Sequence, residues 1–265
     1  MRPLIIFSIV LLTFSSCNDF EKIRGSNDFE FKKQKAFEFF DQKKYDKANI
    51  LLEELLPLHK GKSSFEALYY RYAQTFYLQQ NYLAASYHFK NFGDLFPKSP
   101  KAEQARFLHA ECLFKQSSDY TLEQSNTEKA IGELQNFINA YPSSSKVANA
   151  NTMIDEARSK LEEKDAYAAK QYYKVSQFRA AALYFEKIIN KYPDSKDIDY
   201  YQYMVMKSRY DFAKRSVNAK LVERYQKVID DHEYFMDINS KNQYRSRMEE
   251  LKSLSSQALL KIKKS

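Results

Sequence analysis

One amphipathic helix pattern recurs along the chain, and it constrains the fold more than any other feature. Counted from Phe178, mostly apolar or small residues follow at offsets of 3, 4, 7, 10, 11 and 14, and Pro193 comes directly after the last of them. The same spacing starts at Tyr82 and at Thr127 and again ends at a proline, and from Tyr45 it holds over the first five offsets. Because this spacing gathers side chains on one face of an α-helix, the sequence predicts four copies of one helix.

Two further features organise these helices into pairs. Three copies end in an aromatic-Pro-x-Ser turn ("FPKS", "YPSS" and "YPDS"), where the proline stops one helix and the serine is placed to cap the next. A second alanine lies 12 residues before the first in three copies: Ala36 before Ala48, Ala73 before Ala85, and Ala169 before Ala181. Small residues at both points let two helices cross closely, so we expect buried alanines at each crossing.

The pattern resembles the tetratricopeptide repeat, in which two helices occupy about 34 residues. The resemblance implies an all-α solenoid of about five helix pairs with a C-terminal capping helix. Only 4 Gly and 6 Pro occur, which is too few turn-forming residues for a β-sandwich or barrel. The fifth pair has a degraded register, because "DDHEYFMDINSKN" lacks the proline turn. We expect one repeat domain over 28–265, with repeats at about 28–60, 64–98, 100–143, 162–195 and 199–238 and a capping helix at about 242–263.

The N-terminus has the features of a lipoprotein signal. Arg2 precedes a short apolar run, and the small residues Ser15 and Ser16 lead into Cys17. The pattern resembles a bacterial lipobox, with Phe14 where leucine is usual, and so predicts a signal peptide over 1–16, an acylated Cys17 and a linker over 17–27. Acyl chains on Cys17 would anchor the mature protein to a membrane. The alternative is an ordinary secretion signal followed by a chance cysteine.

The composition argues against several other functions. The net charge is +8, but the charges are interspersed and no zinc-finger or basic-zipper spacing occurs, so nucleic acid is not an expected partner. No Gly-rich phosphate loop, nucleophile elbow or metal-ligand pair is present. We therefore expect a non-enzymatic protein with no catalytic residue, no metal and no cofactor. The four histidines are expected to be surface residues or satisfied helix residues: His59, His88, His109 and His232.

The first helix of each pair lines the groove of a tetratricopeptide-repeat protein. Positions 3 before, 1 after and 4 after the upstream alanine are expected to face this groove. The binding residues predicted in this way are Lys33, Phe37, Phe40, Tyr70, Gln74, Tyr77, Lys170 and Tyr173. An aromatic and basic groove suits an extended peptide with aromatic side chains and a terminal carboxylate. About half of the aromatic residues are expected to be part of the core instead.

Several features together resemble the BamD family of outer-membrane protein assembly lipoproteins. These are the lipobox, the helix pairs, an insertion within "KQSSDYTLEQSNT", and the segment "AYAAKQYYKVSQFRAAALYFEKIINKYPDS". The resemblance is strongest over 119–195, where "LEQSNTEKAI" looks like the insertion loop of the family, and weakest after Asn218. It implies a non-enzymatic subunit that is lipid-anchored in the outer membrane and faces the periplasm.

The same resemblance implies two kinds of protein partner. The C-terminal repeats would hold the periplasmic domains of the barrel insertase, and the N-terminal repeats would meet unfolded outer-membrane β-barrel proteins. The alternative is a periplasmic repeat lipoprotein that serves another envelope complex, in cell-wall coordination or nutrient uptake. Relatives of the first kind carry a coiled coil before their repeats, whereas only about a dozen residues separate Cys17 from the first expected helix here. Relatives of the second kind are roughly twice as long.

Overall fold

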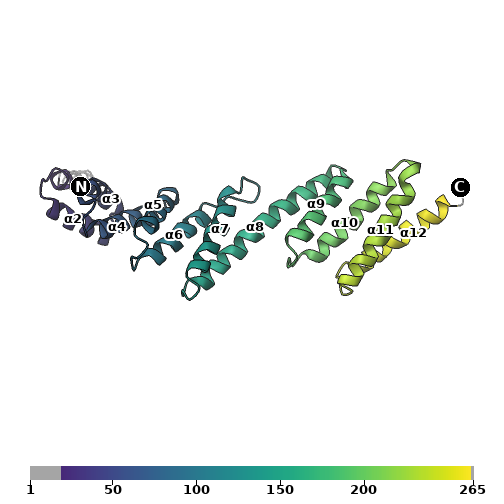
Figure 1. The fold of residues 1–265 in the computed structure, drawn as a ribbon. Helices are drawn as coiled ribbons and strands as arrows, with labels where there is room; N and C mark the ends of the chain where they lie inside the picture. Colours follow the sequence, from purple (N-terminus) through teal and green to yellow (C-terminus); the bar gives the residue numbers. More distant parts are fainter. Residues whose placement is uncertain (1–18, 264–265) are drawn as a thin grey trace, which may run out of the picture. The chain divides into compact units, whose positions relative to one another are not determined.

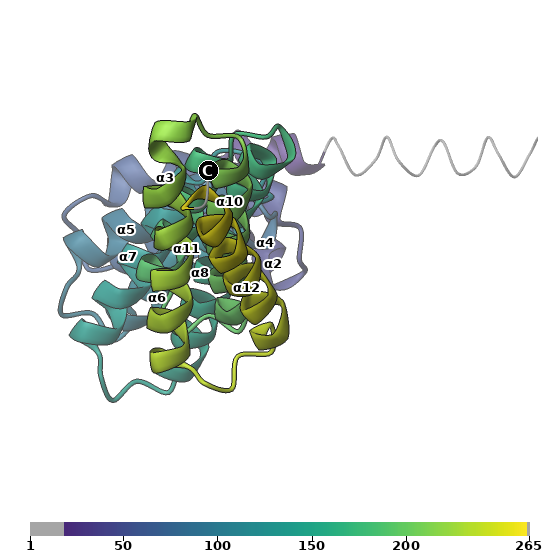
Figure 2. The same ribbon diagram turned by 90° about the vertical axis from the view of Figure 1, so that its right-hand side faces the viewer.

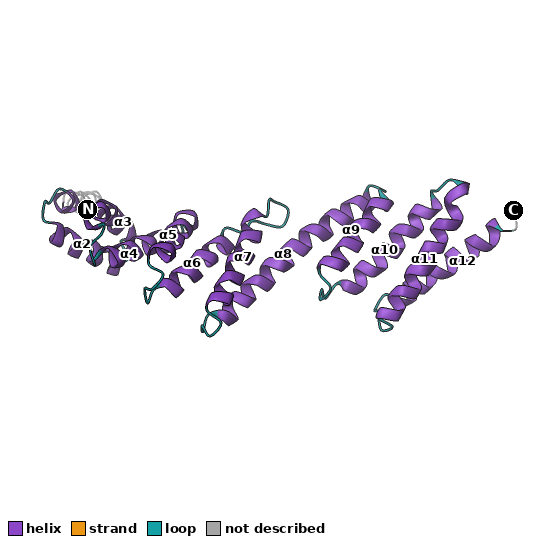
Figure 3. Ribbon diagram, viewed as in Figure 1, coloured by secondary structure: helices purple, strands orange, loops and turns teal. Residues whose placement is uncertain are grey.

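The computed structural model describes residues 19–263, and every regular element in this range is a helix (Figure 1, Figure 3). After a helical segment at 19–24, the helices form pairs: α2 (Phe29–Asp41) with α3 (Tyr45–His59), α4 (Phe65–Leu78) with α5 (Tyr82–Leu95), α6 (Ala102–Lys115) with α7 (Ser125–Ala140), α8 (Val147–Lys174) with α9 (Phe178–Lys191), and α10 (Ile198–Lys214) with α11 (Asn218–Ile238). A last helix, α12 (Arg245–Ile262), lies beside α11 in both views of the ribbon (Figure 1, Figure 2). Five pairs and a final helix confirm the predicted class of tetratricopeptide-repeat fold.

The chain divides into two compact units, which are described separately. The N-terminal unit comprises the described residues up to 158, and the C-terminal unit comprises those from 159 onward. Each has its own buried apolar core, with two clusters in the first unit and one in the second. Within each unit, a helix packs mainly against the helix that follows it in the sequence, as in a repeat array.

The predicted register of the helix pairs is confirmed by burial. The six alanines at the crossing points are fully buried: Ala36, Ala48, Ala73, Ala85, Ala169 and Ala181. The residues at offset 7 of the repeated helix are fully buried as well: Leu52, Phe89, Leu134 and Phe185. The small residues therefore lie where two helices approach closely, and the larger ones fill the core between pairs.

The serine of each proline turn does not cap the following helix, contrary to our expectation. Ser99 lies two residues before Lys101, the N-cap of α6, and its Oγ accepts a hydrogen bond from the Lys101 backbone N–H at 3.0 Å. The same Oγ donates to Glu66 on α4 at 2.6 Å. Two later turns repeat this contact, with Ser144 donating to Glu103 and Ser195 donating to Glu162. We call this contact the turn clasp, since it ties the end of each pair to the first helix of that pair.

The fifth pair closes in a similar way without a proline, and with Asn242 at the position of the clasp serine. The Asn242 Oδ1 accepts from the Tyr244 backbone N–H at 2.8 Å, as the clasp serine does in the other turns. Asp199 on α10 takes the place of the glutamate and accepts from Asn239 at 2.8 Å and from the Gln243 backbone N–H at 2.9 Å. The turn geometry is thus retained where the sequence signature is lost.

The insertion between α6 and α7 is held by one buried glutamine. The side-chain amide of Gln124 donates to the carbonyls of Asp119 at 2.6 Å and Leu122 at 3.1 Å, and its oxygen accepts from the Thr127 hydroxyl at 2.7 Å. Both Gln124 and Thr127 are buried. The loop therefore has a defined conformation despite its length.

Three of the four histidines meet the expectation of a satisfied helix residue, and one does not. His59 bonds to Ser64 at 2.7 Å, His109 bonds to Ser86 at 2.9 Å, and the ring of His88 stacks on Phe76. His232 is buried, and neither ring nitrogen has a hydrogen-bond partner in the described structure. Asn239 comes directly before the turn, as Tyr192 does, and is therefore at offset 14 of the repeated helix. His232 lies seven residues earlier, at offset 7, which is the position of Phe89 and Phe185.

Candidate functional site

An aromatic and cationic surface forms on the first helices of the N-terminal unit. Phe37 and Phe40 on α2 are half-buried, and the Arg71 guanidinium from α4 lies 4.8 Å from the first ring centre and 4.4 Å from the second. Arg71 also bonds to Asp41 at 3.0 Å, which holds it over the rings. A guanidinium stacked on two rings leaves a flat platform that offers both apolar area and positive charge.

Lys33, the basic residue predicted for this groove, already has a partner. Its ammonium is half-buried and pairs with Glu30 one helical turn earlier on α2. The hydrogen bond from Lys33 lowers the pKa of Glu30, so the carboxylate stays charged. A ligand carboxylate at this point would therefore compete with Glu30 for the lysine.

Tyr70 is one of the predicted aromatic residues that belong to the core. Its ring packs edge-on against Phe89 and Phe92, with ring centres 5.9 Å and 5.1 Å away. Only 6% of the residue is exposed, and burial raises the pKa of its hydroxyl to about 12. Tyr70 thus supports the surface from below rather than presenting a ring to a ligand.

Tyr77 and Gln74 lie nearer to the surface of α4. Both are half-buried, and the Tyr77 ring packs edge-on against Tyr82 of α5 at 5.9 Å. Burial raises the pKa of Tyr77 first of all, and the nearby carboxylate of Glu111 adds to the shift. The Lys115 ammonium lies 5.5 Å from the Tyr82 ring centre, so a cation again accompanies the aromatic pair.

The other two predicted residues, Lys170 and Tyr173, belong to the C-terminal unit and form a group of their own. Lys170 on α8 places its ammonium 5.3 Å from the Tyr200 ring centre. The Tyr173 hydroxyl donates to Asp211 on α10 at 2.5 Å, and the Lys207 ammonium lies 5.5 Å from the Tyr173 ring centre. The same pairing of lysine with tyrosine is thus built from different helices.

The sequence analysis missed the continuation of this group along α10 and α12. The rings of Tyr203 and Tyr244 are stacked 5.2 Å apart, and Arg247 lies 5.8 Å from both ring centres. Tyr203 and Lys207 stand 3 before and 1 after Met206, which is fully buried. Met206 occupies the crossing position that alanine takes in other pairs, so the spacing of alanines does not reveal this position.

Comparison with known proteins identifies the family. The model of the YfiO outer membrane lipoprotein family matches residues 32–199, which is more than half of the chain. The chain belongs to the YfiO family. This result confirms the resemblance seen in the sequence and places the chain among outer-membrane lipoproteins, in agreement with the expectation of a non-enzymatic protein.

A more distant similarity supports this membership in the YfiO family. The outer membrane protein assembly factor BamD of Caulobacter vibrioides is 29% identical over 116 residues. The aligned part covers 44% of this chain and 38% of that protein, so the similarity spans well under half of the relative. The YfiO match contains every predicted groove residue from Lys33 to Tyr173, whereas Tyr200, Tyr203 and Tyr244 lie beyond it.

The described part of this YfiO-family chain contains few groups suited to chemistry. Cys112 is fully buried, and burial raises the pKa of its thiol to about 12, so the thiol is not ionised at neutral pH. No cluster of three metal-ligating side chains occurs among residues 19–263. Within the same range, no helix has the length and apolar character that crossing a membrane requires.

Proposed function

We propose that this YfiO-family protein is a lipoprotein subunit of the machinery that assembles β-barrel proteins in the outer membrane. It receives unfolded barrel proteins on its N-terminal unit and holds the periplasmic domains of the barrel insertase through its C-terminal repeats. The family match supports this role, and so does the similarity to an outer membrane protein assembly factor. No step of the role requires a catalytic residue, a metal or a cofactor.

The proposed anchor is Cys17, which lies outside the described residues. The lipobox-like sequence before it supports cleavage at this cysteine and its acylation. Acyl chains contribute roughly 0.8 kcal/mol per buried methylene, and stable anchoring takes more than one chain. The chain is then held at the membrane by its N-terminus and faces the periplasm.

The observation that carries the proposal is the platform of Phe37, Phe40 and Arg71. A barrel protein ends in a strand with alternating aromatic side chains and a terminal carboxylate, as the family resemblance implies. Half-buried rings on α2 suit such side chains, because burying them removes apolar surface from water at little entropic cost. The peptide carboxylate would share Arg71 with Asp41 and compete with Glu30 for Lys33, so it adds less to binding than the rings do.

Peptide binding to the purified chain tests this role. The ligand is a fluorescent extended peptide with alternating aromatic residues and a free C-terminal phenylalanine. Phe40→Ala should weaken binding about thirtyfold, since the loss of a buried aromatic anchor costs about 2 kcal/mol. Amidation of the peptide C-terminus should also weaken binding, because it removes the carboxylate that faces the cations.

Phe31→Ala is the matched control, since Phe31 is exposed and nine residues from Phe40, on the opposite side of α2. Its affinity should equal that of the wild type. Equal affinities for Phe40→Ala and the wild type, with helical content unchanged, would show that this surface is not the site.

A further inference from the structure

A long groove lies between α9 and α11 of the C-terminal unit, with α10 as its floor. It consists of two adjoining hollows of about 690 Å³ and 710 Å³, both of which are lined by Lys227 and Asp230. The groove follows α9 from Arg179 to Asn190 and continues to Pro193 in the turn after the helix. The 11 helical steps from Arg179 to Asn190 correspond to about 17 Å, or roughly three turns.

One end of the groove is basic. It is lined by Arg179 at the start of α9 and by Lys220 and Arg224 in the first two turns of α11. Arg179 has no ion-pair partner in residues 19–263, whereas Lys220 pairs with Glu223, which lines the same hollow, at 2.7 Å. The Arg224 guanidinium lies 4.0 Å from the centre of the Phe212 ring on the floor. The N-termini of α9 and α11 lie at this end together with the C-terminus of α10, so two positive dipole ends and one negative dipole end meet there.

The other end of the groove is apolar. Ile189 and Ile198 line it from α9 and α10, and Tyr234 and Ile238 line it from α11. Tyr234 is 62% exposed and Ile238 is 58% exposed, although both are large apolar side chains. On the basic half of the same groove, Leu183 is 55% exposed, so apolar area extends along its whole length.

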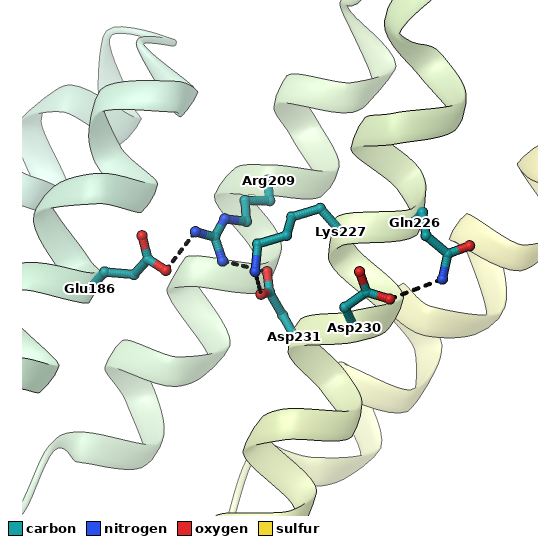
Figure 4. A network of polar contacts seen from close by, with 6 residues as sticks. All are labelled: Glu186, Arg209, Gln226, Lys227, Asp230 and Asp231. Carbon is teal, nitrogen blue, oxygen red and sulfur yellow. Dashed lines mark hydrogen bonds and ion pairs between the residues drawn. The ribbon is translucent and has the colours of Figure 1, made fainter.

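A buried ionic network fixes the middle of the groove (Figure 4). Arg209 on α10 donates to Glu186 of α9 at 2.5 Å and to Asp231 of α11 at 2.6 Å, and Lys227 bonds to Asp231 at 2.8 Å. Burial by itself lowers the pKa of Arg209, but the two carboxylates outweigh this effect and raise it. Glu186 and Asp231 are therefore neutralised by Arg209 and Lys227, as Glu223 is by Lys220. Asp230 lines both hollows and accepts a hydrogen bond from Gln226, so Arg179 and Arg224 face this one carboxylate at the basic end.

We infer that this groove binds an amphipathic helix of a partner protein, with apolar side chains along one face and carboxylates in its last turn. The carboxylates would lie beside Arg179, Lys220 and Arg224, so the partner helix runs antiparallel to α9 and α11. This direction also pairs the negative end of its dipole with the positive ends of theirs. The backbone N–H and C=O groups of the helices that line the groove are hydrogen-bonded within each helix, so an added strand could not pair with them. This favours a helix as the occupant.

This surface lies in the C-terminal repeats, which the proposed function assigns to the barrel insertase, but the inference rests on the groove of α9, α10 and α11 and not on that assignment. The groove contains none of the residues of the peptide platform. The partner is defined by its chemistry alone, an acidic-ended apolar helix. Its binding is therefore measurable whether or not the platform on α2 binds an extended peptide.

A stapled helical peptide of about 15 residues tests the inference. It carries leucines at helical spacing and three glutamates in its last turn, and its binding to the full mature chain in detergent is followed by fluorescence anisotropy. We expect the glutamate peptide to bind the wild type saturably. Arg179→Glu or Tyr234→Ala should lower its affinity at least tenfold. A peptide with lysines in place of the glutamates should bind the Arg179→Glu protein with recovered affinity. Lys187→Glu is the matched control, because Lys187 is exposed on α9 and does not line the groove.

Three results would overturn the inference: no saturable binding of the glutamate peptide to wild type, equal binding of the glutamate and lysine peptides to wild type, or equal losses with Arg179→Glu and Lys187→Glu. Phe40→Ala should leave this binding unchanged, which separates it from the peptide platform. Arg179 is an exposed side chain, so its substitution leaves the fold intact, and circular dichroism verifies this.

Discussion

His232 occupies a core position that the other helix pairs fill with phenylalanine or leucine. Burial lowers the pKa of its imidazole, and the positive charge of Lys252 lowers it further. Both ring nitrogens lack a partner in the described structure, so the residue is held neutral at a cost that an apolar ring would not incur. The sequence offered no sign of this burial, because α11 begins seven residues before the repeated pattern does.

Substitution of His232 by phenylalanine should stabilise the protein and reduce its pH dependence. The folded pKa lies below the unfolded value of about 6.5, so the unfolded chain binds more protons as the pH falls through that value. The free energy of unfolding of the wild type should therefore decrease between about pH 7.5 and pH 5.5. His232→Phe should raise it by about 1 kcal/mol at pH 7.5 and flatten this decrease.

Urea unfolding at several pH values measures both effects of His232→Phe. The other three histidines also have lowered pKa values, so part of the pH dependence should remain. Asp237→Asn serves as a control, since Asp237 is exposed on the same helix and is not among the charges that shift the pKa of His232. A less stable His232→Phe protein with an unchanged pH dependence would contradict this account of the residue.

At the scale of the helix pair, the serine of the turn clasp makes a long-range hydrogen bond that the sequence did not predict. Proline was expected to end one helix and serine to start the next, but the serine hydroxyl also bonds to a glutamate on the first helix of the pair. Serine and glutamate are 33 residues apart in two of these contacts and 41 apart in the third. A contact across so many residues has no local signature, although the repeat period makes it recur.

The second turn of this kind offers a matched test, because it contains three consecutive serines at 143–145. Ser144 donates to Glu103 at 2.6 Å and accepts from the Lys146 backbone N–H at 3.1 Å, whereas Ser145 is exposed. Ser144→Ala should lower the free energy of unfolding by about 1–2 kcal/mol, since it removes a hydrogen bond to a carboxylate. Ser145→Ala should change it by less than about 0.5 kcal/mol in the same urea titration. Equal effects of the two substitutions would rule out the clasp as a stabilising contact.

At the scale of the whole molecule, the fold was predictable because each helix pair repeats a short-range pattern. Period 3.6, crossing alanines and proline turns specify helices and their buried faces without any long-range information. The candidate surfaces were only partly predictable. Arg71 and Tyr244 contribute to them, but neither residue is at one of the three groove positions counted from a crossing alanine. The groove between α9 and α11 depends on which charges Arg209 neutralises, and that is decided by three helices together.

The central claim is that this YfiO-family protein works as an anchored subunit beside a barrel insertase. Affinity purification of the C-terminally tagged chain from detergent-solubilised membranes, with mass spectrometry of the N-terminal peptide and of the partners, tests it most directly. We predict acyl chains on Cys17, recovery from the outer-membrane fraction, and co-purification of the β-barrel insertase. An unmodified Cys17 in the soluble fraction, or co-purification of cell-wall enzymes or nutrient receptors in place of the insertase, would contradict it.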